Sequence, residues 1–221
     1  MGKEVNLLKN YPRSNRRDQL DQRMIGKTSY DKEVARKFGM EFFDGDRRFG
    51  YGGYRYDKKY WGSVVPDICK HYSLGPDSKV LDVGCAKGFM LWDFLRLDPT
   101  LSVKGIDISE YAVSNGHPSV KEHLLVGDAR EIPFPDNEFD LVISINTVHN
   151  LSYEDCGTAL QEIERVSSKY AFIVVDAYST DEERSRIEAW NLTAQTIMKT
   201  SEWVNYFRMV GYFGDYYWFI P

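Results

Sequence analysis

Cysteine is scarce in this sequence, and long apolar runs are missing from it. Only three of the 221 residues are cysteine (Cys69, Cys85 and Cys156), and no two of them stand in C-x-x-C spacing. That pattern predicts no disulfide framework and no metal site, and it fits a reducing compartment. The longest apolar runs, such as AFIVV, fall far short of the roughly 20 residues that cross a bilayer, and the first residues contain no signal-peptide core. We therefore expect a cytoplasmic protein without a membrane partner.

Positive charge is also in short supply. Lysine and arginine total 28 against 33 acidic residues, which gives a formal net charge of −5. A general nucleic-acid binder usually carries a basic surface, so this balance argues against a nucleic-acid partner. The hydrophobic content of 43% and the charged content of 28% are typical of a globular chain, and the length suits one ordinary domain.

Strand and helix patterns alternate regularly from residue 79 onward. Short apolar segments that fit buried strands fall at 79–84, 101–108, 122–129, 139–146 and 170–178. Helical patterns at 89–97, 109–116 and 153–168 separate them. Such alternation predicts an α/β fold, a doubly wound and mostly parallel sheet with helices on both faces.

The regions around this core have a different character. Residues 1–74 contain helical patterns at 29–39 and 60–74, separated by a segment rich in glycine, tyrosine and arginine that we expect to form a structured loop. Residues 179–199 read as a small helical insertion, and 212–220 as one final strand. Either 193–198 supplies a further strand or a partner covers the exposed sheet edge, so a homodimer is plausible.

The stretch DVGCAKG, residues 82–88, ends the first strand and opens a loop. A dinucleotide-binding enzyme would place G-x-G-x-x-G here, but Ala86 stands where the middle glycine, which lets a pyrophosphate pass close to the backbone, is expected. Asp107, at the tip of the second strand, suits ribose hydroxyls. Asp128 can accept a hydrogen bond from an adenine amine while the Ala129 backbone N–H meets a ring nitrogen. Together these residues indicate an adenosine pocket that does not need to hold phosphates.

Four stretches carry a resemblance to a known family: VLDVGCAKGFM, VKGIDIS, VGDAREIPFPDNEFDLVIS and EIERV. In this order and spacing they resemble the class I S-adenosylmethionine-dependent methyltransferases, in particular the ubiquinone-biosynthesis-like and other small-molecule methyltransferases. The resemblance covers residues 75 to about 178. It implies a Rossmann-like, S-adenosylmethionine-binding core in residues 75–221, with the insertion at about 179–199, preceded by an N-terminal lid region in residues 1–74.

The resemblance also implies roles for residues at the strand ends. The loop residues would shape the site around the methionine part of the cofactor, the second strand would bind ribose, the third would contact adenine, and the fourth would lie near the sulfonium. The implied cofactor residues, in that order, are Asp82, Gly84, Cys85, Ala86, Gly88, Asp107, Ile108, Asp128, Ala129 and Asn146. Ala86 departs from the family pattern, and alanine costs little there unless its φ is positive.

A general base is needed only if the accepting atom arrives protonated. His149, just beyond the fourth strand in INTVHNL, is the first candidate because an unperturbed histidine titrates near neutral pH. Alternatively, His149 or Asn150 caps the following loop. Tyr178, after the fifth strand, is either a second candidate base or a wall of the pocket.

The segment FFDGDRRFGYGGYRYDKKYW precedes the cofactor strand, where the family places its lid. Its arginines could pair with a carboxylate or phosphate, and its tyrosines could contact the sulfonium through cation–π attraction. We predict that Tyr51 contacts the cofactor. The predicted acceptor-binding residues are Arg47, Arg48, Tyr54, Arg55, Asn150 and Trp190. The alternatives are a surface loop whose arginines pair with its own aspartates, and a Trp190 that only packs in the core.

Three functions remain open on these residues. The first is a methyltransferase that acts on a small-molecule acceptor. The second is a nicotinamide-dependent oxidoreductase or sugar-nucleotide epimerase, which the missing middle glycine and the lack of a Tyr-x-x-x-Lys pair disfavour. The third is a non-catalytic subunit that binds S-adenosylmethionine.

Overall fold

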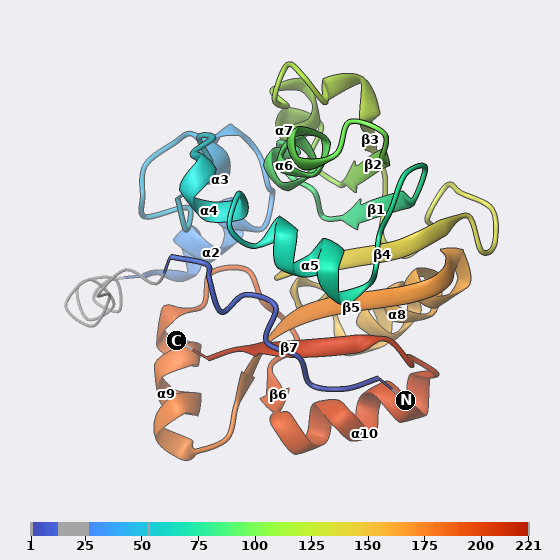
Figure 1. The fold of residues 1–221 in the computed structure, drawn as a ribbon. Helices are drawn as coiled ribbons and strands as arrows, with labels where there is room; N and C mark the ends of the chain where they lie inside the picture. Colours follow the sequence, from blue (N-terminus) through green and yellow to red (C-terminus); the bar gives the residue numbers. More distant parts are fainter. Residues whose placement is uncertain (1, 13–26, 53, 221) are drawn as a thin grey trace.

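A seven-stranded sheet forms the centre of the molecule. A computed structural model describes residues 2–12, 27–52 and 54–220. The strand order is β3-β2-β1-β4-β5-β6, with β7 paired to β5, and every pairing between these strands is parallel. The strands are β1 (Lys79–Val83), β2 (Ser102–Asp107), β3 (Leu124–Val126), β4 (Phe139–Ile145), β5 (Ser167–Tyr178), β6 (Met198–Lys199) and β7 (Asp215–Phe219). The predicted doubly wound α/β fold is confirmed (Figure 1).

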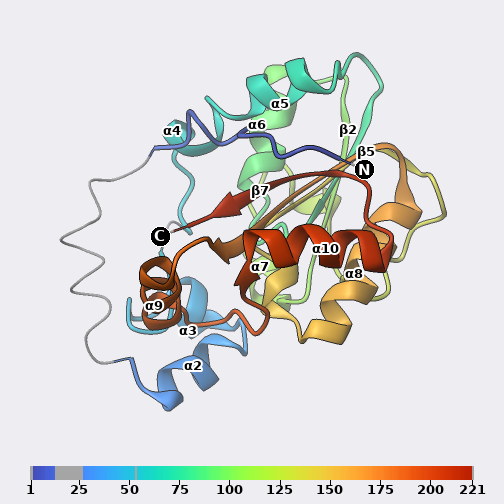
Figure 2. The same ribbon diagram turned by 90° about the horizontal axis from the view of Figure 1, so that it is seen from below.

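Helices cover both faces of this sheet (Figure 2). One face carries α5 (Val65–His71) and α6 (Phe89–Leu97), and the other carries α8 (Tyr153–Val166) and α10 (Thr200–Val210). Side chains of β5 alternate between the two cores: Phe172 and Val174 pack on the α6 side, whereas Ile173 and Val175 pack on the α8 side. The apolar run of β5 is therefore continuous because both of its faces are buried.

Short helices from both ends of the chain gather where the strands end. These are α2 (Ser29–Ala35), α3 (Met40–Phe43), α4 (Lys58–Trp61) and α9 (Asp181–Trp190). In Figures 1 and 2 they lie at the end of the molecule toward which the strand arrows point. After β2, α7 (Glu110–Ser114) begins behind the N-cap residue Ser109, whose side chain accepts the Ala112 N–H. The carboxyl ends of the strands, where α/β folds bind ligands, thus lie beside these helices.

N-terminal residues form backbone hydrogen bonds with the edge strand β7. The Val5 N–H donates to the Tyr216 carbonyl at 2.9 Å, and the Tyr216 N–H donates to the Lys3 carbonyl at 3.0 Å. Residues 198–199 add the short β6 beside the end of β5. The chain's own N-terminal residues therefore line β7, and the homodimer and the division of the chain at residue 75 stay predictions. Within the described ranges, none of the helices has the length and apolarity needed to cross a membrane.

Candidate active site

The loop between β1 and α6 has a backbone that demands glycine at two positions. Gly84 has φ +84°, and a Cβ there would lie 2.1 Å from the Thr147 hydroxyl oxygen. Gly88 has φ +72° and caps the start of α6. Ala86 also has a positive φ, +48°, so the condition under which alanine is costly is met. Holding an L-residue in this region costs about 1–2 kcal/mol.

Two buried aspartates stand beneath this loop. One oxygen of Asp107 accepts the Ala86 N–H at 2.7 Å and the other accepts the Ser109 N–H at 2.9 Å. Burial raises the pKa of Asp107, and these two hydrogen bonds act in the opposite direction. Burial, assisted by the charge of Asp107, raises the pKa of Asp82 to about 8. A cationic group placed beside Asp82 would restore its charge.

The predicted adenine contacts lie beside β2 and β3. Ile108 is 55% exposed, so its side chain is available to pack against a ligand. The Asp128 carboxylate forms an ion pair with Arg130, whose Nε and Nη2 donate to it at 3.0 and 2.6 Å. This ion pair lowers the Asp128 pKa. Ala129 packs partly against the core. The role of Asp128 in reading adenine stays a prediction, and Arg130, which the sequence reading missed, shares that carboxylate.

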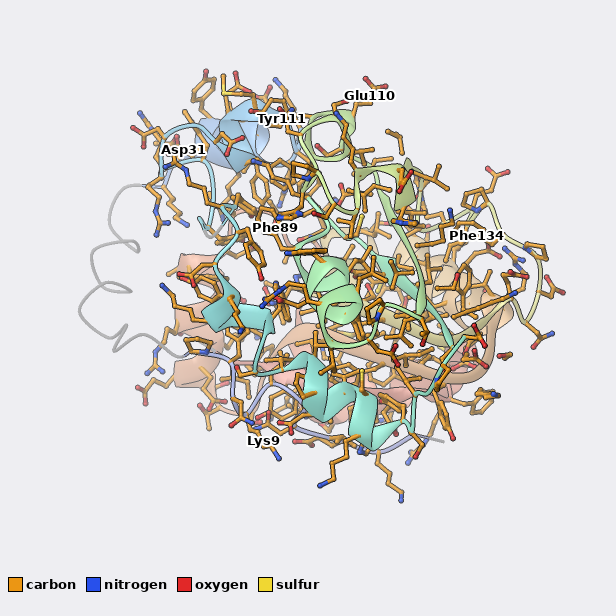
Figure 3. The ribbon with its side chains drawn as sticks, turned by 45° about the horizontal axis from the view of Figure 1, so that its top comes forward. Lys9, Asp31, Phe89, Glu110, Tyr111 and Phe134 are labelled. Atoms are coloured by element: carbon orange, nitrogen blue, oxygen red, sulfur yellow. The ribbon has the colours of Figure 1, made fainter. Side chains whose placement is uncertain are left out.

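An ion pair between the buried Lys87 and the exposed Asp44 ties the N-terminal segment to the glycine loop. The Lys87 ammonium is within 2.8 and 2.7 Å of the two Asp44 oxygens and also donates to the Tyr54 carbonyl at 3.3 Å. The Tyr111 hydroxyl donates to Asp44 at 2.8 Å, and Figure 3 shows Tyr111 at the side of α7 that faces the lid helices. We call Asp44, Lys87 and Tyr111 the lid latch. Sequence reasoning missed Lys87, although it stands inside the motif DVGCAKG.

The lid arginines differ in their surroundings. Arg48 pairs with the buried Asp31 at 2.9 Å, so it holds the lid together internally. The Arg47 guanidinium lies against Gly52, where a Cβ would be 1.5 Å from its Nη1. Arg47 and Arg55 are exposed. The structure does not support an acceptor contact for Arg48, whereas such contacts for Arg47 and Arg55 stay predictions.

Tyr51 and Tyr54 pack in the same cluster as Ala86 but have different further contacts. The Tyr51 hydroxyl accepts the Leu192 N–H at 2.7 Å and the Thr193 N–H at 3.2 Å, and its ring stacks on Trp190 at 4.4 Å. Tyr54 packs against Phe43, and its pKa is raised well above the usual value by burial first, with the charges of Tyr51 and Asp107 adding to the effect. Tyr51 thus contacts the end of α9, and the cofactor contact predicted for Tyr51 and the acceptor contact predicted for Tyr54 stay predictions.

His149 is held in a way that does not support a general base. It lies in the 3-10 turn Val148–Asn150 after β4 and is 3% exposed. Its Nδ1 accepts the Asp176 backbone N–H at 3.0 Å, which leaves the proton of the neutral ring on Nε2. Burial lowers the His149 pKa to about 3. The nitrogen that could take a proton is already occupied, so the prediction of His149 as the base is corrected to a structural role.

The other predicted residues at this end have mixed surroundings. Asn146 has φ +54°, and its carbonyl accepts the Asn150 amide at 3.3 Å. The Arg184 guanidinium of α9 lies over the Tyr178 ring at 5.7 Å, so Tyr178 fits a wall of the pocket better than a general base.

Trp190 is buried, as the core-packing alternative expects, but its Nε1 has no hydrogen-bond partner within the described residues. Cys85 is buried with a pKa well above the usual value, because burial disfavours the thiolate.

Comparison with known proteins agrees with this geometry. The family described as "Methyltransferase domain" matches residues 81–175. The tRNA (carboxymethyluridine(34)-5-O)-methyltransferase of Arabidopsis thaliana is 28% identical over 172 residues, covering 67% of this chain and 39% of that protein. The ubiquinone/menaquinone biosynthesis C-methyltransferase UbiE of Burkholderia cenocepacia is 32% identical over 110 residues, covering 47% of this chain and 44% of that protein. The chain spans less than half the length of these curated relatives.

Solved structures with the same fold include a cyclase. YcgJ of Bacillus subtilis aligns with a TM-score of 0.55 and 22% identity over 66% of each chain. The [4+2]-cyclase SpnF aligns with a TM-score of 0.56 and 19% identity over 76% of this chain and 62% of that one. At these identities the likeness shows the fold alone. The family match to residues 81–175, the parallel strand order and the curated relatives agree that this part of the chain is similar to the class I S-adenosylmethionine-dependent methyltransferases.

Proposed function

We propose that this protein transfers a methyl group from S-adenosylmethionine to a small-molecule acceptor by in-line displacement. The observation that carries the choice of cofactor is the hydrogen bond from the Ala86 N–H to the buried Asp107 carboxylate. In a dinucleotide site the N–H groups of this loop would be open to phosphate oxygens. A carboxylate at that point repels a pyrophosphate, whereas its remaining lone pairs suit ribose hydroxyls.

The residues around the loop fit the rest of this cofactor. When bound, S-adenosylmethionine supplies a methyl group on a positively charged sulfur. Asp82, with its raised pKa, suits the ammonium of the methionine part, and Ile108 offers an exposed apolar side chain to the adenine. Tyr54 and Phe43 place aromatic rings above the loop from the lid. Cation–π attraction to such rings would help to hold the sulfonium.

The covered site favours a small acceptor. The lid is fastened on one side by the lid latch and on the other by the Tyr51 hydroxyl, which binds the backbone at Leu192 and Thr193. Closing a site on both sides excludes water and positions the reactants, and positioning alone is worth about 7–11 kcal/mol of barrier in favourable cases. The negative net charge also suits a metabolite better than a polyanion. Three free cysteines fit a cytoplasmic location.

Calorimetric titration tests the cofactor assignment. S-adenosylmethionine and S-adenosylhomocysteine should each bind one site, and NAD should not. Binding of NAD in their place would favour the oxidoreductase or epimerase. Transfer of a labelled methyl group to metabolite fractions then tests catalysis, and tight cofactor binding without transfer to any fraction would favour the non-catalytic subunit.

A nucleic-acid acceptor is the second candidate. It is favoured by one observation, the relative that covers 67% of this chain and whose name specifies a tRNA uridine as its substrate. The same labelled cofactor can be offered to total tRNA and to a small-molecule extract side by side. Label in tRNA alone would replace the small-molecule proposal.

A further inference from the structure

A buried carboxylate lies at the end of β5, and its nearest ionisable neighbour among the described residues is a histidine. Asp176 has a side chain that is 4% exposed, and its Oδ1 lies 3.6 Å from the His149 Nε2. That separation is beyond hydrogen-bond reach. Across residues 2–12, 27–52 and 54–220, no other side chain or backbone group donates a hydrogen bond to the Asp176 carboxylate. Buried carboxylates are normally satisfied, so the spare capacity of Asp176 indicates a ligand group.

Two buried polar atoms in elements that contact β5 lack partners within the described part of the chain. They are the Trp190 Nε1, a donor, and the Asn150 Oδ1, an acceptor. Trp190 stacks on Tyr51 and contacts Phe219 at 5.1 Å, and Phe219 is the register partner of Asp176 on β7. Asn150 follows His149 directly in the turn after β4. A donor, an acceptor and a carboxylate thus flank the ends of β4 and β5.

We propose that Asp176 is the catalytic residue that removes the proton from the acceptor's nucleophile, and that the acceptor presents a hydroxyl or an amine. The inference rests on the proposed methyl transfer. In the step, the bond from the methyl carbon to sulfur breaks as the bond to the acceptor oxygen or nitrogen forms, and the acceptor's proton passes to the Asp176 carboxylate. The carboxylate later returns this proton to water, so atoms and charges balance.

His149 serves this step as a positioning residue. Its Nδ1 accepts the Asp176 N–H, and its Nε2–H faces the carboxylate of the same residue. The neutral ring borders the carboxylate at 3.6 Å, so its N–H dipole favours the ionised form without neutralising it. The other groups on this side are the Tyr51 hydroxyl, whose pKa is raised by burial and also by Asp176, and Lys27, which donates to the Trp190 carbonyl at 3.0 Å. Burial raises the pKa of Asp176 to about 7, and a base is most effective when its pKa is near the working pH.

Sinefungin tests this without knowledge of the acceptor. This cofactor analogue carries a primary ammonium at the place of the methylated sulfur, so it probes for a carboxylate at the transfer position. Asp176→Asn should weaken sinefungin binding about 10-fold or more and change S-adenosylhomocysteine binding less than about twofold. The matched control Asp136→Asn, a surface carboxylate paired with Arg165, should change neither affinity.

Equal losses for both ligands, or no loss for either, would overturn the proposal. If neither ligand binds the unchanged protein, the proposed methyl transfer fails instead. Should Asp176→Asn not fold, calorimetry of the unchanged protein in two buffers near pH 7 gives the answer. Sinefungin should then release more protons than S-adenosylhomocysteine does, because its ammonium keeps Asp176 ionised, and equal release would contradict the role.

The pH dependence of sinefungin binding tests the positioning role of His149. His149→Asn removes the Nε2–H that faces the carboxylate but retains a side-chain acceptor for the Asp176 N–H. The pH at which sinefungin binding is half-maximal should rise in this variant, while S-adenosylhomocysteine affinity stays within about twofold. An unchanged pH profile would remove His149 from the step.

Discussion

The cofactor side and the acceptor side of the site are built in different ways. On the cofactor side, Gly84, Ala86 and Asp107 are joined through the backbone, and the whole unit lies within two consecutive strands and one loop. On the acceptor side, Tyr51 and Leu192 meet across 141 residues of sequence. A motif can describe the first arrangement, because its geometry is local. The second arrangement exists only once the chain has folded.

Gly84→Ala should give the largest effect, because it breaks the cofactor side at its most constrained point. The new Cβ would meet three Thr147 atoms at 2.1–2.6 Å, and the backbone would keep a positive φ. We expect the free energy of unfolding to fall by about 2–4 kcal/mol, with loss of S-adenosylhomocysteine binding. Denaturant unfolding and calorimetry measure the two effects. Gly127→Ala, where the nearest atom would be 3.4 Å away, is the control, and equal losses in both variants would contradict the account.

Replacing one lid tyrosine at a time sharpens the comparison between the two sides. Tyr51→Phe leaves the buried N–H groups of Leu192 and Thr193 without their acceptor, so the free energy of unfolding should fall by about 1–3 kcal/mol. Its S-adenosylhomocysteine affinity should change little. Tyr54→Leu removes an aromatic ring from the proposed cofactor site and should weaken that affinity severalfold. If Tyr51→Phe weakens S-adenosylhomocysteine more than Tyr54→Leu does, the proposed roles of the two tyrosines are wrong.

Lys87→Met tests whether the lid latch joins the two sides. Methionine keeps an apolar chain of similar length but removes the donor to both Asp44 oxygens. The dissociation rate of S-adenosylhomocysteine should rise about fivefold, as measured by stopped-flow fluorescence, since an ion pair with one exposed partner contributes about 1 kcal/mol. Tyr111→Phe removes one hydrogen bond to Asp44 and leaves the ion pair, so it should have a smaller effect. Equal rates in the unchanged protein and in Lys87→Met would show that the latch does not retain the cofactor.

Ala86→Gly should have the smallest effect and the opposite sign. Its φ of +48° is strained for alanine and free of strain for glycine. Glycine also makes the unfolded chain more flexible, so the net gain in the free energy of unfolding should be only about 0.5–1 kcal/mol. Ala112→Gly, within α7, should instead lose about 1 kcal/mol. A loss of stability in Ala86→Gly would mean that the loop backbone is not held as described.

The sequence predicted most of the fold, because the alternation of strands and helices is a local pattern. The expected helix at 89–97 agrees with α6, and the helical pattern at 109–116 contains α7. The parallel sheet follows from the alternation of strands and helices.

The sequence could not predict contacts that join distant segments. Nothing in the pattern around Lys87 indicates Asp44, which is 43 residues away. The sequence placed His149 as the base, since a histidine after β4 is conspicuous, but only the fold shows that its Nδ1 is occupied by the Asp176 N–H. In the sequence, Asp176 is one polar residue inside an apolar strand. Only the fold shows that it is buried and that it lies beside His149.

A crystal structure with S-adenosylhomocysteine bound tests the central claim most directly. The account predicts the ribose hydroxyls on the Asp107 carboxylate, the adenine against Ile108, and the sulfur facing the end of β5, with Asp176 bordering the space that the methyl group left. S-adenosylhomocysteine bound away from the glycine loop, or with its sulfur turned away from Asp176, would contradict it.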